Sequence, residues 1–307
     1  MSPREFKQHI ARTLLYYEIF DHPLTASELF FLLPCNSISR PEFIQMLHTL
    51  TTDGDVVESS GLFTLADVAD DVRSLRRERE RLARRRLRVA KFMTHVIKRF
   101  PFVRGVFLSG DLSKGVAHHH SDIDYVIVTA QHRLWVCRIL LVLFKKTLLL
   151  NSRRYFCLNY FVAENNLTLE DRNYFTATEI AHLKPLYNIE LFLRYMNANR
   201  WVKEYFPNFK VFAFTGDEGN NHASMLQKVL ELPFTGTWVN RFDRAIMEKM
   251  KSIWARRYPQ YDTQTRERIF RCTPTESCAY VGNFSDKILG MYNERLSRHQ
   301  LTPANHE

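Results

Sequence analysis

The segment at 103–130, with the sequence VRGVFLSGDLSKGVAHHHSDIDYVIVTA, constrains the fold of this chain more than any other stretch. It contains two apolar runs rich in β-branched residues, at 103–109 and 122–128, and short runs of this kind are typical of buried strands. Gly110 ends the first run at a point where the backbone must turn sharply. The pattern therefore predicts two strands joined by a glycine turn, a short helix at 111–115 and a polar loop.

Two pairs of polar residues in this segment suggest phosphate and metal chemistry. Ser113 and Lys114 stand at the predicted start of the short helix, where free N–H groups and positive potential favour a phosphate. Asp122 and Asp124 begin the second run, and strand alternation places them on one face with Cα atoms about 6.6 Å apart. Carboxylates so placed can hold metal ions about 3.5–4 Å apart, as in two-metal phosphoryl-transfer sites.

The order of these motifs resembles the signature of the polymerase-β-like nucleotidyltransferase superfamily. A strand ends in S-G, a helix starts at S-K-G, and S-D-I-D then leads into an apolar strand. The resemblance covers residues 100–162, about a fifth of the chain, and rests on the ordered pair of motifs, because D-x-D alone is a weak signal. It implies a small mixed sheet flanked by helices, with Mg²⁺ bound by the D-x-D acids and a nucleoside triphosphate held by the glycine turn.

Carried over residue by residue, the resemblance assigns a nucleotide-binding group and a metal-binding group. The nucleotide-binding residues would be Ser109, Gly110, Asp111, Ser113 and Lys114. Two Mg²⁺ ions would be bound by Asp122 and Asp124, which are therefore also the first candidate catalytic residues. The implied reaction transfers a nucleoside monophosphate from a triphosphate such as ATP to an acceptor that the sequence does not identify.

The chain departs from the family pattern at two positions. Asp111 stands where the family usually has serine, and an acid beside a triphosphate is repelled unless a cation lies between them. The family also has a third carboxylate on a later strand, but the matching position of the strand predicted at 155–162 holds Asn159. An amide can ligate a cation but cannot accept a proton near neutral pH. Glu164, two residues past that strand, is the nearest substitute for a catalytic base.

Simpler interpretations exist for two of these features. The acids of S-D-x-D could only cap backbone N–H groups and solvate a surface, although two acids before an apolar strand are costly without a partner. His118, His119 and His120 suggest a metal site, but consecutive residues cannot all face one side and no ligand spacing accompanies them. We therefore expect an exposed loop at the histidines.

Composition favours a cytoplasmic protein of two or three domains. The chain has 307 residues, 45% of them hydrophobic and 25% charged, as in an ordinary globular protein. Its five scattered cysteines suggest a reducing compartment, and the first residues contain no apolar signal segment. The apolar stretch at 134–150 is interrupted by Arg138, Lys145 and Lys146, which favours a buried helix over a membrane span.

Residues 1–68 predict three helices followed by a hairpin, an order that resembles a winged-helix domain. Capping boxes at 25–28 and 39–42 start the second and third helices, and the hairpin turns near Ser60 and Gly61. DNA is one candidate partner of such a domain. The third helix, however, exposes Glu42, Gln45 and His48, and no Arg or Lys for phosphate contacts. Packing against another protein surface, or acting as a lid over the catalytic domain, is the favoured role.

Residues 69–99 predict one long basic helix. Nine arginines lie between positions 73 and 88, in the sequence RSLRRERERLARRRLR, and they contribute much of the net charge of +10. Good helix formers and interleaved glutamates favour a helix. The default interpretation is a solvated linker, and the functional alternative is a positive rim that attracts a triphosphate or a polyanionic acceptor.

The remaining chain divides into a catalytic core at 100–182 and a helical domain at 183–307. Helices are predicted at 183–196, 238–258 and 285–298, with aromatic residues such as Phe192 and Trp201 in the core. By resemblance, this helical domain would shape the nucleotide and acceptor pocket.

Two hypotheses of function follow from the sequence. The first is a Mg²⁺-dependent nucleotidyltransferase of the α+β class, with an N-terminal winged helix and a C-terminal helical domain. The alternative is a catalytically impaired nucleotide sensor or regulator, in which Asp111 and Asn159 mark lost chemistry and the winged helix binds DNA or a protein partner.

Overall fold

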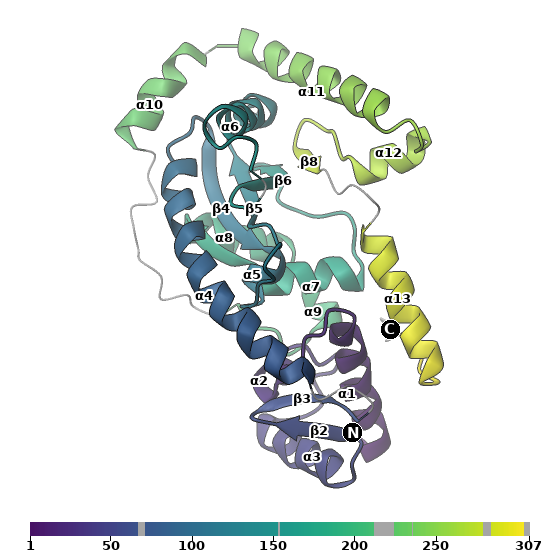
Figure 1. Cartoon of the computed structure of the whole chain (residues 1–307). Coiled ribbons are helices and arrows are strands. Elements are labelled where there is room, and N and C mark those ends of the chain that lie inside the picture. The colour runs from purple at the N-terminus through teal and green to yellow at the C-terminus, as the bar shows by residue number, and fades with distance from the viewer. Residues whose placement is uncertain (67–70, 153, 212–223, 235, 279–283, 304–307) are drawn as a thin grey trace.

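The computed structural model describes residues 1–66, 71–152, 154–211, 224–234, 236–278 and 284–303, and only the backbone of Arg73 and Asn159. The fold is of the α+β class, with a mixed sheet flanked by helices and a smaller N-terminal unit at one end (Figure 1). To this extent the predicted fold class is confirmed. No helix in these ranges is long and apolar enough to cross a membrane.

A five-stranded sheet forms the centre of the molecule. In spatial order its strands are β7 (Lys184–Tyr187), β4 (Val103–Ser109), β5 (Asp124–Thr129), β6 (Cys157–Ala163) and β8 (Glu276–Cys278). The β5 and β6 strands are parallel, and every other neighbouring pair is antiparallel. A parallel pair requires a long crossover, which α6 (Leu134–Leu148) supplies. The prediction of a crossover helix at 134–150 is thus confirmed, but only its first half is buried, since Ile139, Leu143 and Leu148 are exposed.

Helices cover both faces of this sheet. Besides α6, they are α4 (Asp71–Ile97), α7 (Tyr174–His182), α8 (Ile189–Ala198), α9 (Val202–Tyr205), α10 (Met225–Glu231), α11 (Trp238–Arg257), α12 (Thr263–Ile269) and α13 (Phe284–Arg298). Strand alternation separates two hydrophobic cores, one containing Phe107 and Val126 and the other containing Val106 and Ile127. The first core includes residues of α7, α8, α9 and α13, and the second includes residues of α4, α6 and α11.

The N-terminal unit follows the order expected from its sequence. It contains α1 (Pro3–Glu18), β1 (Leu24–Thr25), α2 (Ala26–Phe31), α3 (Arg40–Thr52), β2 (Val56–Ser59) and β3 (Leu62–Leu65). Both predicted capping boxes are present. The side chains of Thr25 and Ser39 each accept the backbone N–H of the glutamate three residues later, and that glutamate's carboxylate accepts the backbone N–H of the capping residue. The three short strands pair in the order β1-β3-β2, with β3 between the other two.

The long basic helix α4 is not simply a solvated linker, as the default interpretation expected. It runs from the N-terminal unit along the sheet (Figure 1), and Arg76, Arg79 and Arg86 are buried. Arg76 pairs with Glu28 at 2.8 Å and also bonds the Pro23 carbonyl, while Arg79 donates to two carbonyls after α1 at 2.9 Å. These arginines are buried because carbonyl and carboxylate oxygens replace their water. Arg76 and Arg79 attach the N-terminal unit to the rest of the molecule.

Several predicted boundaries were wrong in the C-terminal half. Residues 184–187, predicted as the start of a helix, form the edge strand β7, and Pro185 is tolerated there because an edge strand needs fewer N–H donors. The edge strand β8 was not predicted, because its three residues are too few to form a recognisable apolar pattern. The second strand of the central motif begins at Asp124 rather than at Asp122, and the third covers 157–163 rather than 155–162.

We predict that Arg76→Ala weakens the attachment of the N-terminal unit. The change removes a buried guanidinium and leaves the Pro23 carbonyl and the Glu28 carboxylate without this donor. The free energy of unfolding in urea should fall by about 2–3 kcal/mol. The matched control is Arg77→Ala on the exposed side of the same helix, which should change it by less than about 0.5 kcal/mol. Equal losses in both variants would contradict the assignment.

Candidate functional site

The glycine turn after β4 and the first residue of β5 meet at one point. Gly110 adopts a φ of +66°, and a Cβ added there would lie 2.6 Å from the Asp124 carboxylate. Both the backbone angle and the missing side chain therefore require glycine. The contact follows from the antiparallel register, which pairs Ser109 with Asp124. The sheet thus places a carboxylate directly against a turn that leads into the short helix α5 (Gly110–Ser113).

An open cavity of about 640 Å³ lies over this turn and gathers acidic side chains. Its lining includes five carboxylates and one amine, which belong to Asp21, Asp111, Asp122, Asp124, Glu179 and Lys114. The two acids of S-D-I-D line it together, although Asp122 lies before the strand and not within it. Their predicted convergence on one site is therefore observed, by a geometry other than strand alternation.

The environment of Asp124 disfavours its negative charge. The pKa of this carboxyl is raised to about 6, chiefly because burial removes water from it. Negative charges on Asp122, Glu179 and Asp111 add to the rise, and a hydrogen bond with Cys157 acts in the opposite direction. A carboxylate held under such conditions is typical of functional sites, where a cation or a proton completes the balance of charge.

Lys114 and Glu179 form a close ion pair at the side of the cavity. The lysine Nζ lies 2.5 Å from Glu179 Oε1, and the Ser109 hydroxyl donates to the other carboxylate oxygen at 3.4 Å. Burial acts to lower the pKa of Lys114, but the charges of Glu179 and Asp111 outweigh it and the pKa is raised. The lysine therefore stays charged beside the glycine turn, with the carboxylates of Glu179 and Asp111 near it.

Other predicted site residues lie elsewhere. Ser113 is buried, and its hydroxyl donates to the Gly110 carbonyl at 2.7 Å, so it stabilises the turn from beneath and does not line the cavity. Glu164 follows the far end of β6, next to Thr129. That end is about 17 Å along the strands from Asp124, and the structure therefore does not bring Glu164 to the site. Asn159 lies in β6, and its side chain is outside the described part of the chain.

Glu179 was missed by the sequence analysis. It comes from α7, 65 residues after Lys114, to which it is hydrogen-bonded. Nothing in the local sequence FTATEIAH marks this glutamate as more than one polar position of a helix. Only the packing of α7 against the end of β4 gives it a role, because that packing brings its carboxylate to Ser109 and Lys114.

The N-terminal unit forms one wall of the acidic cavity. Ile19, Phe20 and Asp21, which follow α1, line it, and Lys114 lies over the Phe20 ring at 5.9 Å. The Tyr17 hydroxyl is 2.6 Å from the His182 ring at the end of α7, so α1 also fixes the helix that carries Glu179. The N-terminal unit is therefore part of the wall of the site.

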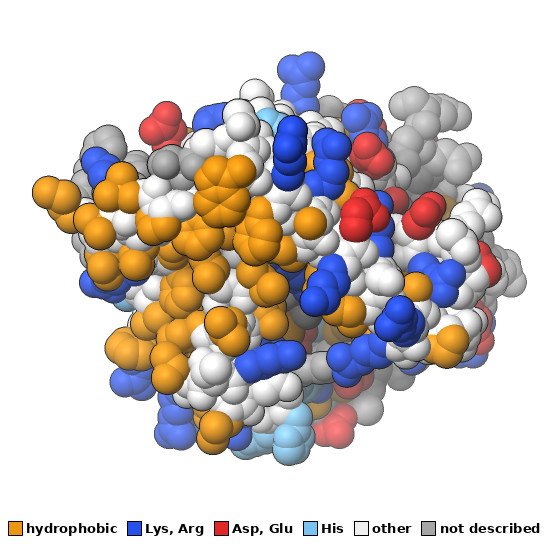
Figure 2. Space-filling view, turned by 90° about the horizontal axis from the view of Figure 1, so that it is seen from above, with side chains coloured by type: hydrophobic (Ala, Val, Ile, Leu, Met, Phe, Trp, Pro, Cys, Tyr) orange, Lys and Arg blue, Asp and Glu red, His pale blue; other side chains and the backbone are white. Residues whose placement is uncertain are grey.

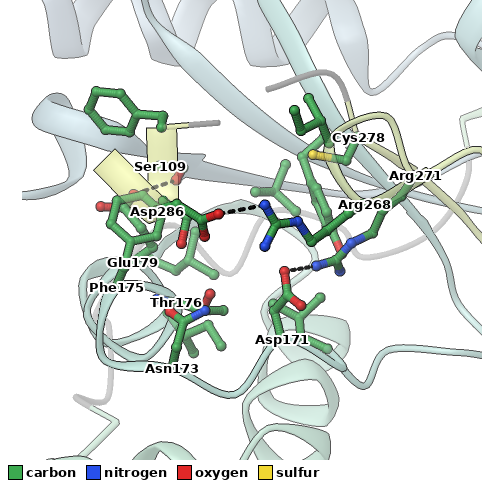
Figure 3. A pocket seen from close by; sticks show the side chains of 18 of the residues that line it. Ser109, Asp171, Asn173, Phe175, Thr176, Glu179, Arg268, Arg271, Cys278 and Asp286 are labelled. Carbon is green, nitrogen blue, oxygen red and sulfur yellow. Dashed lines mark hydrogen bonds and ion pairs between the residues drawn. The ribbon is translucent and has the colours of Figure 1, made fainter. Parts of the chain in front are cut away.

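A second, smaller cavity adjoins the first (Figure 3). Its volume is about 180 Å³, and Ser109 and Glu179 are among the residues that line both cavities. Aromatic and aliphatic side chains from the sheet, α7, α8, α12 and α13 form about half of its lining, and two charged pairs lie at one side. These pairs are Arg268 with Asp286 at 2.5 Å and Arg271 with Asp171. The site therefore has an acidic compartment and an apolar compartment with Glu179 between them.

The histidine loop is exposed, as expected. His118, His119 and His120 all lie at the surface, and His118 Nε2 is 3.6 Å from the Asp111 carboxylate. Arg86 of α4 donates to the His119 carbonyl at 2.6 Å and also bonds the Ser121 carbonyl. The basic helix thus holds the loop that leads into the two acids.

The donor set fits Mg²⁺ bound together with a nucleotide. In the described ranges, no group of three or more His, Cys, Asp or Glu side chains could hold a metal ion without further ligands. Mg²⁺ commonly takes only one or two carboxylates and completes its shell with water and substrate phosphates. Asp122 and Asp124 supply such a pair, and the pKa of Asp124 is raised first by burial and then by neighbouring negative charges, which a cation would offset.

Comparisons of the chain with models of known protein families, with curated proteins and with solved structures find no match. Function must therefore be argued from the chemistry of this site, since a fold alone does not define an activity.

We predict a pH-dependent difference in stability between the wild type and Asp124→Asn. Because the folded-state pKa of about 6 exceeds the ordinary value of 3.8, the unfolded chain releases this proton first as pH rises. The wild type should therefore lose about 2–3 kcal/mol of unfolding free energy between about pH 4 and pH 6.5 relative to the asparagine variant, which does not titrate. Urea denaturation in EDTA measures it, and a difference that stays constant with pH would contradict the burial of this charge.

Proposed function

We propose that the protein is a Mg²⁺-dependent nucleotidyltransferase that transfers a nucleoside monophosphate from a nucleoside triphosphate to an acceptor. The observation that carries the proposal is the contact between the Gly110 turn and the Asp124 carboxylate, with Asp122 and Lys114 in the same cavity. The start of α5 offers backbone N–H groups to a phosphate. The two aspartates beside it offer a pair of metal-binding carboxylates at the same place. The resemblance of the two motifs to the polymerase-β-like superfamily supports the same assignment.

The roles of the residues follow from their positions. Asp122 and Asp124 would hold Mg²⁺, which supplies charge neutralisation for the triphosphate and the leaving pyrophosphate. Gly110 leaves room for the Asp124 carboxylate at the start of α5, so the phosphates would meet that carboxylate through Mg²⁺, with Lys114 in the same cavity. Asp111 faces the same cavity, so it either contributes a further metal ligand or limits the affinity for the nucleotide.

Glu179 is proposed as the group that accepts the proton of the acceptor. The acceptor oxygen forms a bond to the α-phosphorus, the bond from that phosphorus to its bridging oxygen breaks, and pyrophosphate leaves. Glu179 faces both cavities, so it can touch an acceptor in the apolar compartment and a nucleotide in the acidic one. Lys114 pairs with Glu179 in this structure. When a triphosphate binds, the lysine ammonium would interact with its phosphates instead, which would leave the Glu179 carboxylate free to accept a proton.

The N-terminal unit is proposed to be a winged helix that acts as a lid. The order of its three helices and its β1-β3-β2 pairing support that fold. The exposed side of α3 carries Glu42, Gln45 and His48. Its single Arg or Lys is Arg40 at the first turn, which donates to the Ser27 hydroxyl at 3.0 Å, so the helix offers little positive charge to a phosphate backbone. Its place in the wall of the acidic cavity favours a role in enclosing the nucleotide over a role in binding DNA.

A nucleotide sensor without transfer activity is the second candidate. The short Lys114–Glu179 pair favours it, because a lysine held by a carboxylate at 2.5 Å is less available to phosphate. Asp111 in the same cavity points in the same direction. A sensor of this kind would bind a triphosphate with Mg²⁺ but release no pyrophosphate.

We predict that Asp122→Asn and Asp124→Asn each abolish Mg²⁺-dependent transfer. Replacing a metal-binding carboxylate by an amide removes charge without changing shape, so the folded state should be kept. Pyrophosphate release from the preferred triphosphate should fall by about a hundredfold or more. Asp53→Asn, at an exposed position at the end of α3 away from both cavities, provides a charge-matched comparison that keeps most activity. Full turnover in either of the first two variants would refute their role.

Glu179→Gln and Glu164→Gln form a second matched pair. If Glu179 is the general base, its amide variant should lose about 10²–10⁴-fold in transfer rate and still bind the triphosphate with Mg²⁺. Glu164→Gln changes the same chemical group beyond the far end of β6 and should leave the rate nearly unchanged. Single-turnover transfer and equilibrium binding of the triphosphate separate the two effects. If Glu164→Gln lost more transfer rate than Glu179→Gln, the general base would be Glu164 and not Glu179.

A further inference from the structure

Helix α10 is oriented with its polar residues toward the protein. Gln227 is fully buried, and its side-chain amide donates to the carbonyls of Phe100 and Val103 at 3.0 and 2.7 Å. Glu231 accepts the N–H of Phe102 at 2.6 Å and pairs with Arg104 at 2.8 Å. The helix is therefore anchored by hydrogen bonds and an ion pair, which is the reverse of the usual arrangement for a surface helix.

The apolar residues of the same helix point outward. Met225, Leu226, Val229 and Leu230 are between 42% and 83% exposed. The first turns of α11 add Trp238 and Phe242, which contact each other at 6.2 Å between ring centroids and are also exposed. These six side chains are called the apolar cap. A group of this size on a surface marks an interaction site more often than chance.

Further apolar and basic side chains surround the apolar cap. Seen from the end of the molecule that carries α6, α10 and α11, hydrophobic side chains gather over a wide area with Lys and Arg beside them (Figure 2). Ile139, Leu143 and Leu148 of α6 are among the exposed ones. The three helices contain ten Lys and Arg against three Asp and Glu, and of the ten only Arg138 is buried. Of the three acids, Glu231 pairs with Arg104, Asp243 accepts the N–H of Val136, and Glu248 pairs with Lys251 at 3.4 Å. The exposed charges of the rim are therefore mostly positive.

We propose that the apolar cap and its basic rim bind an anionic lipid membrane surface. Exposed Leu, Val, Met and Trp side chains next to Lys and Arg are the composition of segments that lie in the interface of a bilayer. The apolar groups would enter the boundary between headgroups and acyl chains, and the basic groups would contact the headgroup phosphates. A second copy of this chain fits less well, because two positive rims would face each other across the contact.

Co-sedimentation of the full chain with lipid vesicles tests the proposal. We expect binding to vesicles of phosphatidylcholine and phosphatidylserine in equal parts to exceed binding to phosphatidylcholine alone by roughly tenfold or more, and to weaken with salt. The double variant Leu226→Gln, Val229→Gln should lose roughly tenfold in binding to the anionic vesicles. The control is Ile44→Gln, a similar change at a residue 47% exposed on α3, which should bind as the wild type does. Circular dichroism verifies that each variant is folded.

Three outcomes would overturn the proposal. The first is no binding to either kind of vesicle. The second is binding that the double variant retains in full while folded. The third is a dimer, measured by light scattering, that the double variant converts to a monomer while neither protein binds vesicles, because the apolar cap would then be an interface between two copies of this chain.

Discussion

The candidate site depends on the antiparallel register between β4 and β5. That register pairs Ser109 with Asp124 and brings the Asp124 carboxylate against the Cα of Gly110. A side chain at position 110 would occupy the space of the carboxylate, and a shift of the register by one residue would turn the acid to the other face. The turn, the start of α5 and the acidic cavity all follow from this single contact.

Buried charges connect the site to elements that are distant in sequence. Lys114 pairs with Glu179 of α7, while Arg76 and Arg79 of α4 bond the segment that follows α1. Each of these groups would be costly to bury alone, and each is buried where oxygen atoms of another element surround it. The N-terminal unit and α7 are thus held around the acidic cavity by polar contacts. The same principle explains why α10 can face solvent with its apolar side, since Gln227 and Glu231 hold it from within.

Local sequence was sufficient for features that depend on neighbouring residues. The capping residues Thr25 and Ser39, the strand at 103–109 and the crossover helix at 134–148 could all be predicted, because propensity, capping and periodicity act over a few positions. The edge strands β7 and β8 could not, since short edge strands carry little hydrophobic pattern. Glu179 could not be found either, because its partners come from contacts between segments far apart in the chain.

Calorimetric titration of the purified protein with each of the four nucleoside triphosphates, first with Mg²⁺ and then with EDTA, tests the central claim most directly. The account predicts that at least one triphosphate binds, that EDTA removes the binding, and that Asp124→Asn removes it as well, because the carboxylate against Gly110 holds the metal that the phosphates share. Binding that persists in EDTA and in Asp124→Asn, or no binding of any triphosphate, would contradict it.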